Sequence, residues 1–205
     1  MIRYADLDPS KKAFIFELDN VLYPERDYML QVYYLFANFI EFTEASPSSK
    51  ELTDFLKTAF EHHGTVGLFE KASELFGIDK KYQENFKKLH YTARLPLKLH
   101  LYDQMLILLQ EMVIDRKKIF IVTDGNPEEQ LNKIKQMDWN GLEKYLVVYF
   151  TEEIKPKPET DVLEVLLGQH QLLRKDLLVI GNTVTDEEFA SSSGIDYIDV
   201  GNFIT

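Results

Sequence analysis

A short apolar stretch near the start of the chain constrains its fold more than any other feature. Residues 13–16 have the sequence AFIF, and Glu17 and Asp19 stand one residue apart where this apolar run stops. An uninterrupted apolar run is typical of a parallel strand that is buried on both faces. In open parallel α/β sheets, ligands bind just beyond the carboxyl ends of the strands. The stretch therefore predicts a buried strand with two carboxylates at a ligand-binding edge.

Composition narrows the classes of protein to consider. The 205 residues are 45% hydrophobic, carry a formal net charge of −11 and include no cysteine. A surface for nucleic acid or an anionic membrane needs clustered lysine and arginine, so we expect neither partner. No apolar run approaches the ~18 residues of a membrane span, and the first residues are too polar for a signal peptide. Without disulfides or thiolate chemistry, the sequence favours a cytoplasmic protein.

The stretch from 24 to 99 is predicted to be helical. Apolar residues recur at spacings of three and four between 24 and 44, which indicates an amphipathic helix. Ser48 and Glu51 form a capping box for a second helix running to about His63. Gly64 and Gly77 separate two further helices, over 66–76 and 80–92. We therefore interpret 24–99 as a helical insert.

From residue 102 onwards, helices and strands alternate. The pattern predicts helices over 105–112, 127–137 and 160–167, and strands over 118–122, 145–150, 177–180 and 195–200. Together with the first strand, these segments predict an α/β fold with a Rossmann-like parallel sheet of about five strands. The expected domains are a core over 1–23 and 100–205 and a helical cap over 24–99.

The turn after the strand at 118–122 is a candidate phosphate site. Thr123 is followed by Asp124 and Gly125, and Asn126 with Glu129 forms a capping box for the next helix. Such a turn offers free backbone N–H groups, a hydroxyl and a glycine that lets an anion approach closely. A well-capped connection between a strand and a helix needs the same residues for structural reasons alone.

Two later strand ends also carry polar side chains. The loop Lys155-Pro156-Lys157-Pro158 could hold a lysine beside an anion, although solvated lysines on a proline-stiffened turn would give the same sequence. After the strand at 177–180, Thr185 and Glu188 are the expected capping box, and Asp186 falls in the first helical turn. Asp186 could interact with the helix dipole alone or face a metal ion.

The four strand ends together resemble the signature motifs of the haloacid dehalogenase (HAD) superfamily. The matching residues are Glu17-x-Asp19-x-Val21, Thr123, Lys155-Pro156 and Gly181-Asn182-x-x-x-Asp186. The insert after the first motif resembles the helical cap of subfamily I, which includes phosphoglycolate phosphatase. Residues 19–24 and 123–126 are also similar to members that act as 5′-nucleotidases.

The resemblance implies a role for each matching position. Position 17 would be the nucleophile, and Asp19 would protonate the leaving group and then activate water. Thr123 and Lys155 would bind the phosphoryl oxygens. A carboxylate that forms an acyl phosphate, with a nearby acid and a cation, is what phosphoryl transfer of this type requires.

The resemblance also implies ligand sites. Thr123, Asp124, Gly125 and Lys155 would surround the phosphate of a small phosphorylated metabolite, such as a nucleotide or a sugar phosphate. The implied cofactor is Mg²⁺. Its ligands would be Glu17, Asp19 through its backbone carbonyl, Asn182 and Asp186.

Two positions depart from the superfamily pattern. Glu17 replaces the usual aspartate nucleophile, and Asn182 replaces a usual metal-ligating aspartate. One extra methylene moves a carboxylate by roughly 1 to 1.5 Å, and a misplacement of about 1 Å can cost on the order of 100-fold in rate. Asn182 keeps an oxygen ligand but removes a negative charge, which should weaken Mg²⁺ binding.

Three hypotheses follow from these departures. The first is a Mg²⁺-dependent phosphatase whose activity is weakened by Glu17. The second is a catalytically degenerate protein that binds a phosphate-bearing ligand without turnover. The third is a haloacid dehalogenase, which needs no metal but would also need an attacking aspartate at position 17.

Overall fold

The computed structural model describes residues 3–201, so the ends of the predicted core at 1–2 and 202–205 lie outside the described residues. The chain divides into two compact units. The first contains the chain up to residue 25, residues 99–131 and the chain from residue 137. The second contains residues 26–98 and 132–136.

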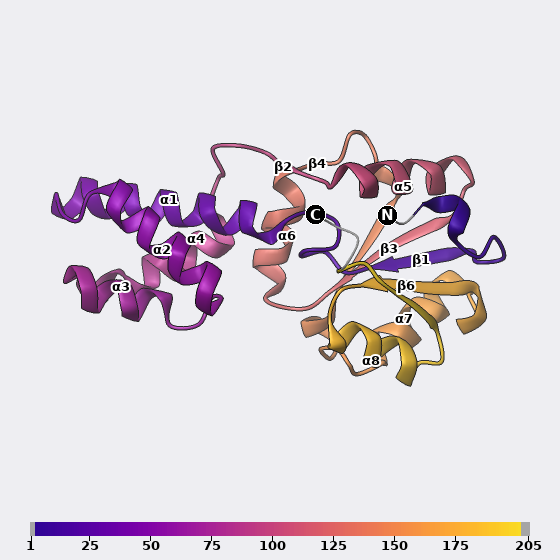
Figure 1. The fold of residues 1–205 in the computed structure, drawn as a ribbon. Coiled ribbons are helices and arrows are strands. Elements are labelled where there is room, and N and C mark those ends of the chain that lie inside the picture. The colour runs from indigo at the N-terminus through magenta and orange to yellow at the C-terminus, as the bar shows by residue number, and fades with distance from the viewer. Residues whose placement is uncertain (1–2, 202–205) are drawn as a thin grey trace. The chain divides into compact units, whose positions relative to one another are not determined.

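The first unit is built on a five-stranded parallel sheet, as predicted. Its strands are β1 (Ala13–Phe16), β3 (Lys118–Thr123), β5 (Leu146–Phe150), β6 (Leu177–Gly181) and β7 (Asp196–Asp199). Their order across the sheet is β5-β3-β1-β6-β7, and every neighbouring pair is parallel. Figure 1 shows β1 near β3 and β6. This arrangement is the expected α/β class with a Rossmann-like core.

The register around β1 fixes where its carboxyl end lies. Phe16 pairs with Ile121 on β3 and with Ile180 on β6. The backbone N–H of Glu17 then donates a hydrogen bond to the carbonyl of Ile180 at 3.1 Å. Because β1 is held on both sides, Glu17 emerges at a position that the two neighbouring strands determine.

Helices cover both faces of this sheet. They are α5 (Asp103–Ile114), α7 (Asp161–His170) and α8 (Val184–Ser192). Helix α6 (Pro127–Gln136) follows β3, and its residues from Asn132 onwards belong to the second unit. One buried cluster joins apolar side chains of β1, β3 and β6 to α7 and α8, among them Ile15, Phe120, Val179, Leu163 and Phe189. Helix α5 contacts β3 and buries Met105, Leu108, Leu109 and Met112. Coverage on two faces explains why the strand sequences are continuously apolar.

Shorter elements complete the unit. They are the 3₁₀ turns η1 (Tyr4–Asp6), η3 (Glu143–Tyr145), η4 (Thr151–Glu153) and η5 (Arg174–Asp176), with the strands β2 (Leu99–His100) and β4 (Met137–Asp138). Strands β2 and β4 form a separate parallel pair that the sequence did not predict. Two residues are too few to show a strand periodicity. Met137 was expected at the end of the helix over 127–137, but the helix ends at Gln136 and Met137 lies in β4.

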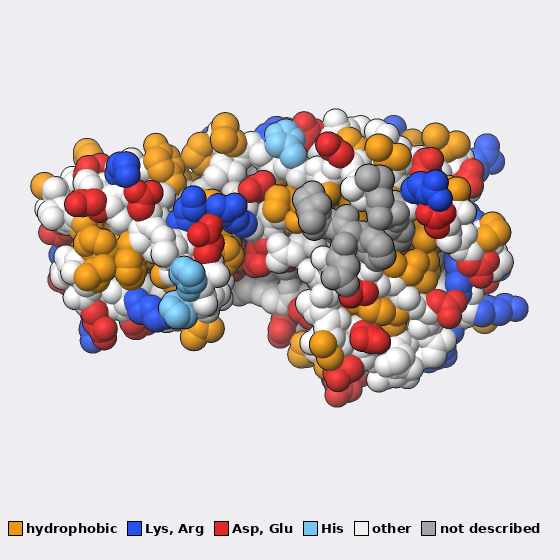
Figure 2. Space-filling model, viewed as in Figure 1, with side chains coloured by type: hydrophobic (Ala, Val, Ile, Leu, Met, Phe, Trp, Pro, Cys, Tyr) orange, Lys and Arg blue, Asp and Glu red, His pale blue; other side chains and the backbone are white. Residues whose placement is uncertain are grey.

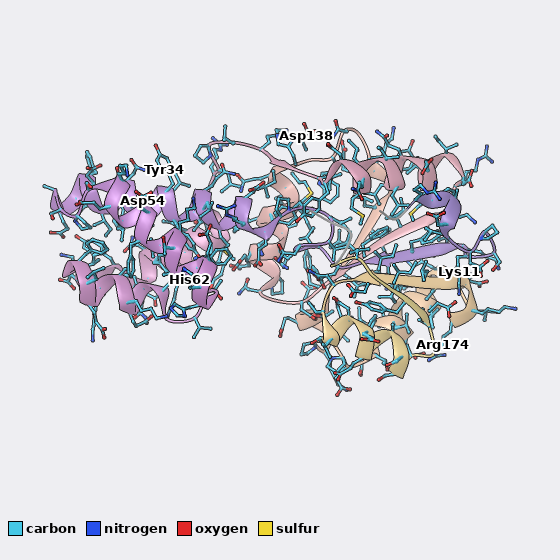
Figure 3. The ribbon with its side chains drawn as sticks, in the orientation of Figure 1. Lys11, Tyr34, Asp54, His62, Asp138 and Arg174 are labelled. Carbon is cyan, nitrogen blue, oxygen red and sulfur yellow. The ribbon has the colours of Figure 1, made fainter. Side chains whose placement is uncertain are left out.

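A buried lysine ties together elements at the amino end of the sheet. Lys11, labelled in Figure 3, lies two residues before β1. Its Nζ is 2.5 Å from Asp196 Oδ2 on β7 and donates to the carbonyl of Lys175 at 3.1 Å. These contacts join the chain before β1 to the start of β7 and to η5.

The second unit consists of helices. They are α1 (Glu25–Glu44), whose first residue belongs to the first unit, α2 (Ser49–His63), α3 (Leu68–Phe76), the turn η2 (Lys80–Tyr82) and α4 (Gln83–Thr92). Ser48 and Glu51 form the predicted capping box of α2. Gly64 and Gly77 are the C-caps of α2 and α3. Their positive φ angles, 67° and 69°, are conformations that glycine adopts at little cost.

Aromatic rings form much of the interior of this unit. The ring of Phe86 stacks on Tyr33 with centroids 6.0 Å apart and meets Phe36 edge-on at 4.9 Å. Phe69 lies 5.8 Å from Phe86 in the same group. Such pairs contribute about 0.5–1.5 kcal/mol each beyond the burial of their area.

The surface carries charges of both signs. In the face that Figure 2 shows, acidic side chains are interspersed with lysine and arginine over both units. Among residues 3–201, no helix has the length and apolar character needed to cross a membrane.

Candidate active site

The carboxylate of Glu17 is the centre of a buried polar cluster at the carboxyl end of β1. Its Oε1 accepts hydrogen bonds from the Thr123 hydroxyl and from the backbone N–H of Leu18, the latter at 2.8 Å. Its Oε2 accepts from the Lys157 ammonium. Glu17, Thr123 and Lys157 are all buried. A hydroxyl, a backbone amide and an ammonium therefore converge on one oxyanion.

The lysine in this cluster is Lys157, which corrects the expectation for Lys155. Lys157 Nζ contacts Glu17 and lies 2.6 Å from Asp186 Oδ1. Lys155 Nζ is paired with Asp161 at 2.8 Å, and its side chain is 56% exposed. Both lysines follow β5 in the same loop, and the sequence offered two candidates two residues apart. The loop backbone directs only the second one into the sheet edge.

Asp124 anchors the loop that presents Lys157. Its Oδ1 accepts hydrogen bonds from the Thr151 hydroxyl and from the backbone N–H of Lys157, the latter at 3.0 Å. The carboxylate that was expected near a phosphate is therefore used to hold a neighbouring loop. Gly125 follows with φ of 94°, a backbone conformation that glycine adopts at little cost.

Asp19 is joined to the cluster through a residue that the sequence analysis did not single out. Gln130 is buried on α6, and its Nε2 lies 2.8 Å from Asp19 Oδ2, 2.8 Å from Thr123 Oγ1 and 2.8 Å from the Asp124 carbonyl. The other carboxylate oxygen, Oδ1, accepts from the Tyr23 hydroxyl at 2.7 Å. Gln130 is four residues after the N-cap residue Asn126. Residues at this spacing lie on the same face of a helix, so the sequence could have indicated that Gln130 faces the turn after β3.

Asp186 caps α8 and contacts Lys157. Its Oδ2 accepts from the Thr183 hydroxyl at 2.7 Å and from the backbone N–H groups of Asn182 and Thr183. The capping box is thus Thr183 with Asp186, not the expected Thr185 with Glu188. The absence of a side chain at Gly181 allows the Asp186 side chain to pack against the backbone there, because a Cβ at position 181 would lie 2.5 Å from Asp186 Cβ. No other residue type could occupy position 181 without displacing the carboxylate.

Burial and neighbouring charges shift the pKa values of the three central groups. Burial is the largest influence on Glu17 and raises its pKa, with Asp186 adding to the shift and Lys157 opposing it. Burial alone would lower the pKa of Lys157, but the carboxylates of Glu17, Asp186 and Asp124 outweigh it and raise the pKa. The pKa of Asp186 is lowered, because Lys157 and the capping donors outweigh its burial. The ammonium and the Asp186 carboxylate are therefore both charged at neutral pH.

The residues expected to bind magnesium do not fit that ion as they are arranged. Both oxygens of Glu17 and both oxygens of Asp186 already accept hydrogen bonds. Lys157 places a positive charge between these two carboxylates. Asn182 Oδ1 is buried without a hydrogen-bond partner. Among residues 3–201, no three histidine, aspartate or glutamate side chains gather as a metal site.

The arrangement is suited to binding an oxyanion next to a carboxylate. Preorganised donors in a water-poor site stabilise negative charge far better than the same groups do in water. Glu17 could attack an electrophile held at this edge, and Asp19 stands two residues further along the chain to exchange protons. Of the expected residues, Glu17 and Asp186 contact Lys157, and Thr123 contacts Glu17. Asp19 is joined to Thr123 through Gln130.

Comparison with known proteins identifies the family of this chain. Residues 14–200 match the family model described as haloacid dehalogenase-like hydrolase. One curated relative, enolase-phosphatase E1 from Culex quinquefasciatus, is 22% identical over 102 residues. This match covers 50% of the chain but only 14% of the relative's length.

Solved structures of low sequence identity share the fold. A provisionally assigned β-phosphoglucomutase from Thermotoga maritima has a TM-score of 0.60 at 22% identity, covering 90% of this chain and 82% of its own. A provisionally assigned HAD hydrolase from Bacillus subtilis, determined with bound magnesium, has a TM-score of 0.58 at 15% identity, covering 91% and 87%. A HAD phosphatase from Thermococcus onnurineus has a TM-score of 0.56 at 21% identity, covering 92% and 85%.

Proposed function

The chain belongs to the haloacid dehalogenase-like hydrolases, and we propose that it is a phosphohydrolase of low turnover acting on a small phosphomonoester. The observation that carries this proposal is the convergence of Thr123, the Leu18 amide and Lys157 on the Glu17 carboxylate. The same three donors could hold the oxygens of a phosphoryl group. The relatives named as phosphatases support the reaction class.

In the proposed reaction, Glu17 and Asp19 divide the chemistry. An oxygen of Glu17 attacks phosphorus while the bond from phosphorus to the ester oxygen breaks, and Asp19 gives a proton to the departing oxygen. Asp19 then removes a proton from water, which attacks the acyl phosphate and releases inorganic phosphate and the Glu17 carboxylate. Lys157 and Thr123 would stabilise charge on the transferred group.

The contacts of Glu17 explain why turnover would be low. Its carboxylate takes up the donors that a phosphoryl group would need, so an incoming substrate must displace them. The extra methylene also moves the attacking oxygen by roughly 1 to 1.5 Å relative to an aspartate. Both effects come from the length of one side chain.

The same contacts favour a second candidate function, binding of a phosphorylated ligand without turnover. In that case Glu17 would act as a fixed neighbour of the ligand and never as a nucleophile. A haloacid dehalogenase remains the third candidate, since it would use the same attacking position without a metal.

A phosphatase screen of purified variants separates these functions. The natural protein, Glu17→Asp and Asp19→Asn would be assayed for phosphate release from p-nitrophenyl phosphate, nucleotides and sugar phosphates, each with Mg²⁺ and with a chelator. Slow release by the natural protein that is lost in Asp19→Asn supports the phosphohydrolase. Ligand binding by all three proteins without release supports the binding function, and halide release from haloacids with chelator present supports the dehalogenase.

A further inference from the structure

A cavity lies within the first unit, at the amino end of the sheet. It has a volume of about 370 Å³ and forms beside the starts of β3 and β5. Its lining residues come from the end of α5, the following turn, β3, η3, β5 and the end of α7; the ones that matter for ligand binding are Arg116, Lys117, Lys118, Tyr145, Val147 and His170. The volume is within the range of small-molecule sites, which is roughly 300–1,000 Å³. It shares no lining residue with the candidate active site.

The charge of this cavity is opposite to that of the chain. Arg116, Lys117 and Lys118 line it, and none of its described lining residues is acidic. The chain as a whole has a net charge of −11. The nearby Asp115 accepts a hydrogen bond from the Tyr4 hydroxyl at 2.8 Å. Three consecutive cations without a carboxylate in the lining therefore form a local positive site on an acidic protein.

Backbone carbonyls hold two of these cations in place. Lys117 Nζ donates to the carbonyls of Pro9 and Lys11, and Lys118 Nζ donates to the carbonyl of His170 at 3.1 Å. Carbonyl oxygens carry no net charge, so both ammonium groups keep theirs. Lysines that only protect an exposed strand edge would extend into solvent. Here the Lys118 amine is fixed to the backbone of the lining residue His170, and the Lys117 amine is fixed to carbonyls outside the lining.

The rest of the lining is apolar and partly aromatic. Aliphatic and aromatic surface comes from Val113, Ile119, Phe120 and Val147. Tyr145 also lines the cavity, and it is 47% exposed. The His170 ring is 4.6 Å from the Phe120 ring, and its Nε2 is 3.0 Å from the Tyr149 hydroxyl. Burial, with Lys118 adding to it, lowers the pKa of His170. At neutral pH the imidazole therefore offers an uncharged ring to a ligand.

We propose that this cavity binds a small organic anion with a flat apolar body, in which an aromatic ring system lies against Val147, Tyr145 and His170 and an acidic group faces Arg116 and Lys118. The cations supply the attraction for the acidic group, and the apolar wall supplies the area for the ring. A phosphate or sulfate ion without an apolar body would gain only the first of these. This site is independent of the reaction at Glu17.

A fluorescence titration of the full chain with 1-anilinonaphthalene-8-sulfonate tests the proposal. Saturable binding at one site is expected, and N-phenyl-1-naphthylamine, which lacks the sulfonate, should bind at least several-fold more weakly. The double substitution Arg116→Asn with Lys118→Gln should weaken binding of the sulfonate by on the order of tenfold. Asparagine is chosen because Arg116 has φ of 56°, which asparagine tolerates.

Two further variants locate the site. Val147→Trp should fill the cavity and abolish binding, whereas Lys71→Gln removes an exposed cation on α3, outside the lining, and should leave the affinity unchanged. Proton NMR signals of the His170 ring should shift on addition of the probe. Circular dichroism and thermal unfolding confirm that each variant is folded.

The proposal is overturned by absence of saturable binding, by equal affinity of the neutral compound, or by affinities that are the same in all folded variants. Glu17→Asp serves as an independent control and should leave binding at this site unchanged. Failure of the phosphatase screen therefore would not affect the outcome here, and the reverse also holds.

Discussion

The two ends of the sheet each contain one buried lysine, but the partners of these lysines differ. Lys157 at the carboxyl end has a side chain that is 3% exposed, between Glu17 and Asp186 at 10% and 2%. Lys11 at the amino end is 6% exposed, but its partner Asp196 is 70% exposed. The two lysines are similarly buried, and the burial of their carboxylate partners is what differs between the two ends.

The charge balance at the two ends differs for the same reason. At the carboxyl end, one ammonium contacts two buried carboxyl groups in a poorly solvated place. At the amino end, one ammonium faces one solvated carboxylate and a backbone carbonyl. Buried charges are expensive to desolvate, whereas exposed ion pairs contribute little. The carboxyl end therefore has the features of a site maintained for chemistry.

The largest effect is expected from removing the cation at the carboxyl end. Lys157→Met should lower the free energy of unfolding by about 3–5 kcal/mol, because it leaves Glu17 and Asp186 buried without compensation. Urea unfolding measures this change. Lys155→Met in the same loop is the matched control and should cost about 1 kcal/mol or less, since its pair with Asp161 is exposed.

A second substitution shows whether the charge is the cause. Adding Glu17→Gln to Lys157→Met removes one of the two stranded carboxylates and should recover part of the lost stability. Equal stability of Lys157→Met and Lys155→Met would show that the two ends of the sheet do not differ as described.

The next largest effect concerns catalysis at the carboxyl end. Glu17→Asp should raise kcat/KM for a phosphomonoester by on the order of 100-fold, because it withdraws the carboxylate from the donors around it. Steady-state assays of phosphate release measure this ratio. Glu152→Asp makes the same change at an exposed position and should have no effect. A fall in activity in Glu17→Asp would count against the proposed role of side-chain length.

A smaller effect is expected from Gln130. In the Glu17→Asp background, Gln130→Met should lower kcat by on the order of tenfold with little change in KM, because it removes the amide that joins Asp19 to Thr123. Gln110→Met, on the exposed face of α5, is the control. An increase in KM with kcat unchanged would assign Gln130 to ligand binding, and unchanged kinetics would remove it from the site.

The smallest effect is expected at the amino end. Lys11→Met should lower the free energy of unfolding by about 1 kcal/mol or less, and 1 M salt should reduce the difference further because Asp196 is solvated. The loss caused by Lys157→Met should persist in high salt, since buried pairs are screened much less. A larger loss for Lys11→Met than for Lys157→Met would reverse the comparison.

The sequence was sufficient to predict the sheet and the strand ends that form the site. Continuous apolar runs such as residues 119–122 and 177–180 are visible without tertiary information, and parallel strands bring their carboxyl ends to one edge. Glu17 and Thr123 could therefore be placed together in advance. Their direct contact in the structure follows from the register of β1 with β3.

Choices between neighbouring side chains could not be made in this way. Lys155 and Lys157 are equivalent by composition, and only the hydrogen bond from the Lys157 amide to Asp124 decides which one enters the sheet edge. Thr183 and Thr185 each have an acid three residues later, so both satisfy the capping spacing. Such alternatives depend on backbone directions that are set by distant contacts.

The position of β1 between β3 and β6 has a consequence for how the chain accommodates Glu17. Paired on both sides, the strand cannot slip by one residue, because every side chain would then turn to the opposite face. The extra methylene must be absorbed by the glutamate side chain itself, which bends back toward Thr123 and Lys157. The substitution Glu17→Asp would thus shorten one side chain without moving any strand.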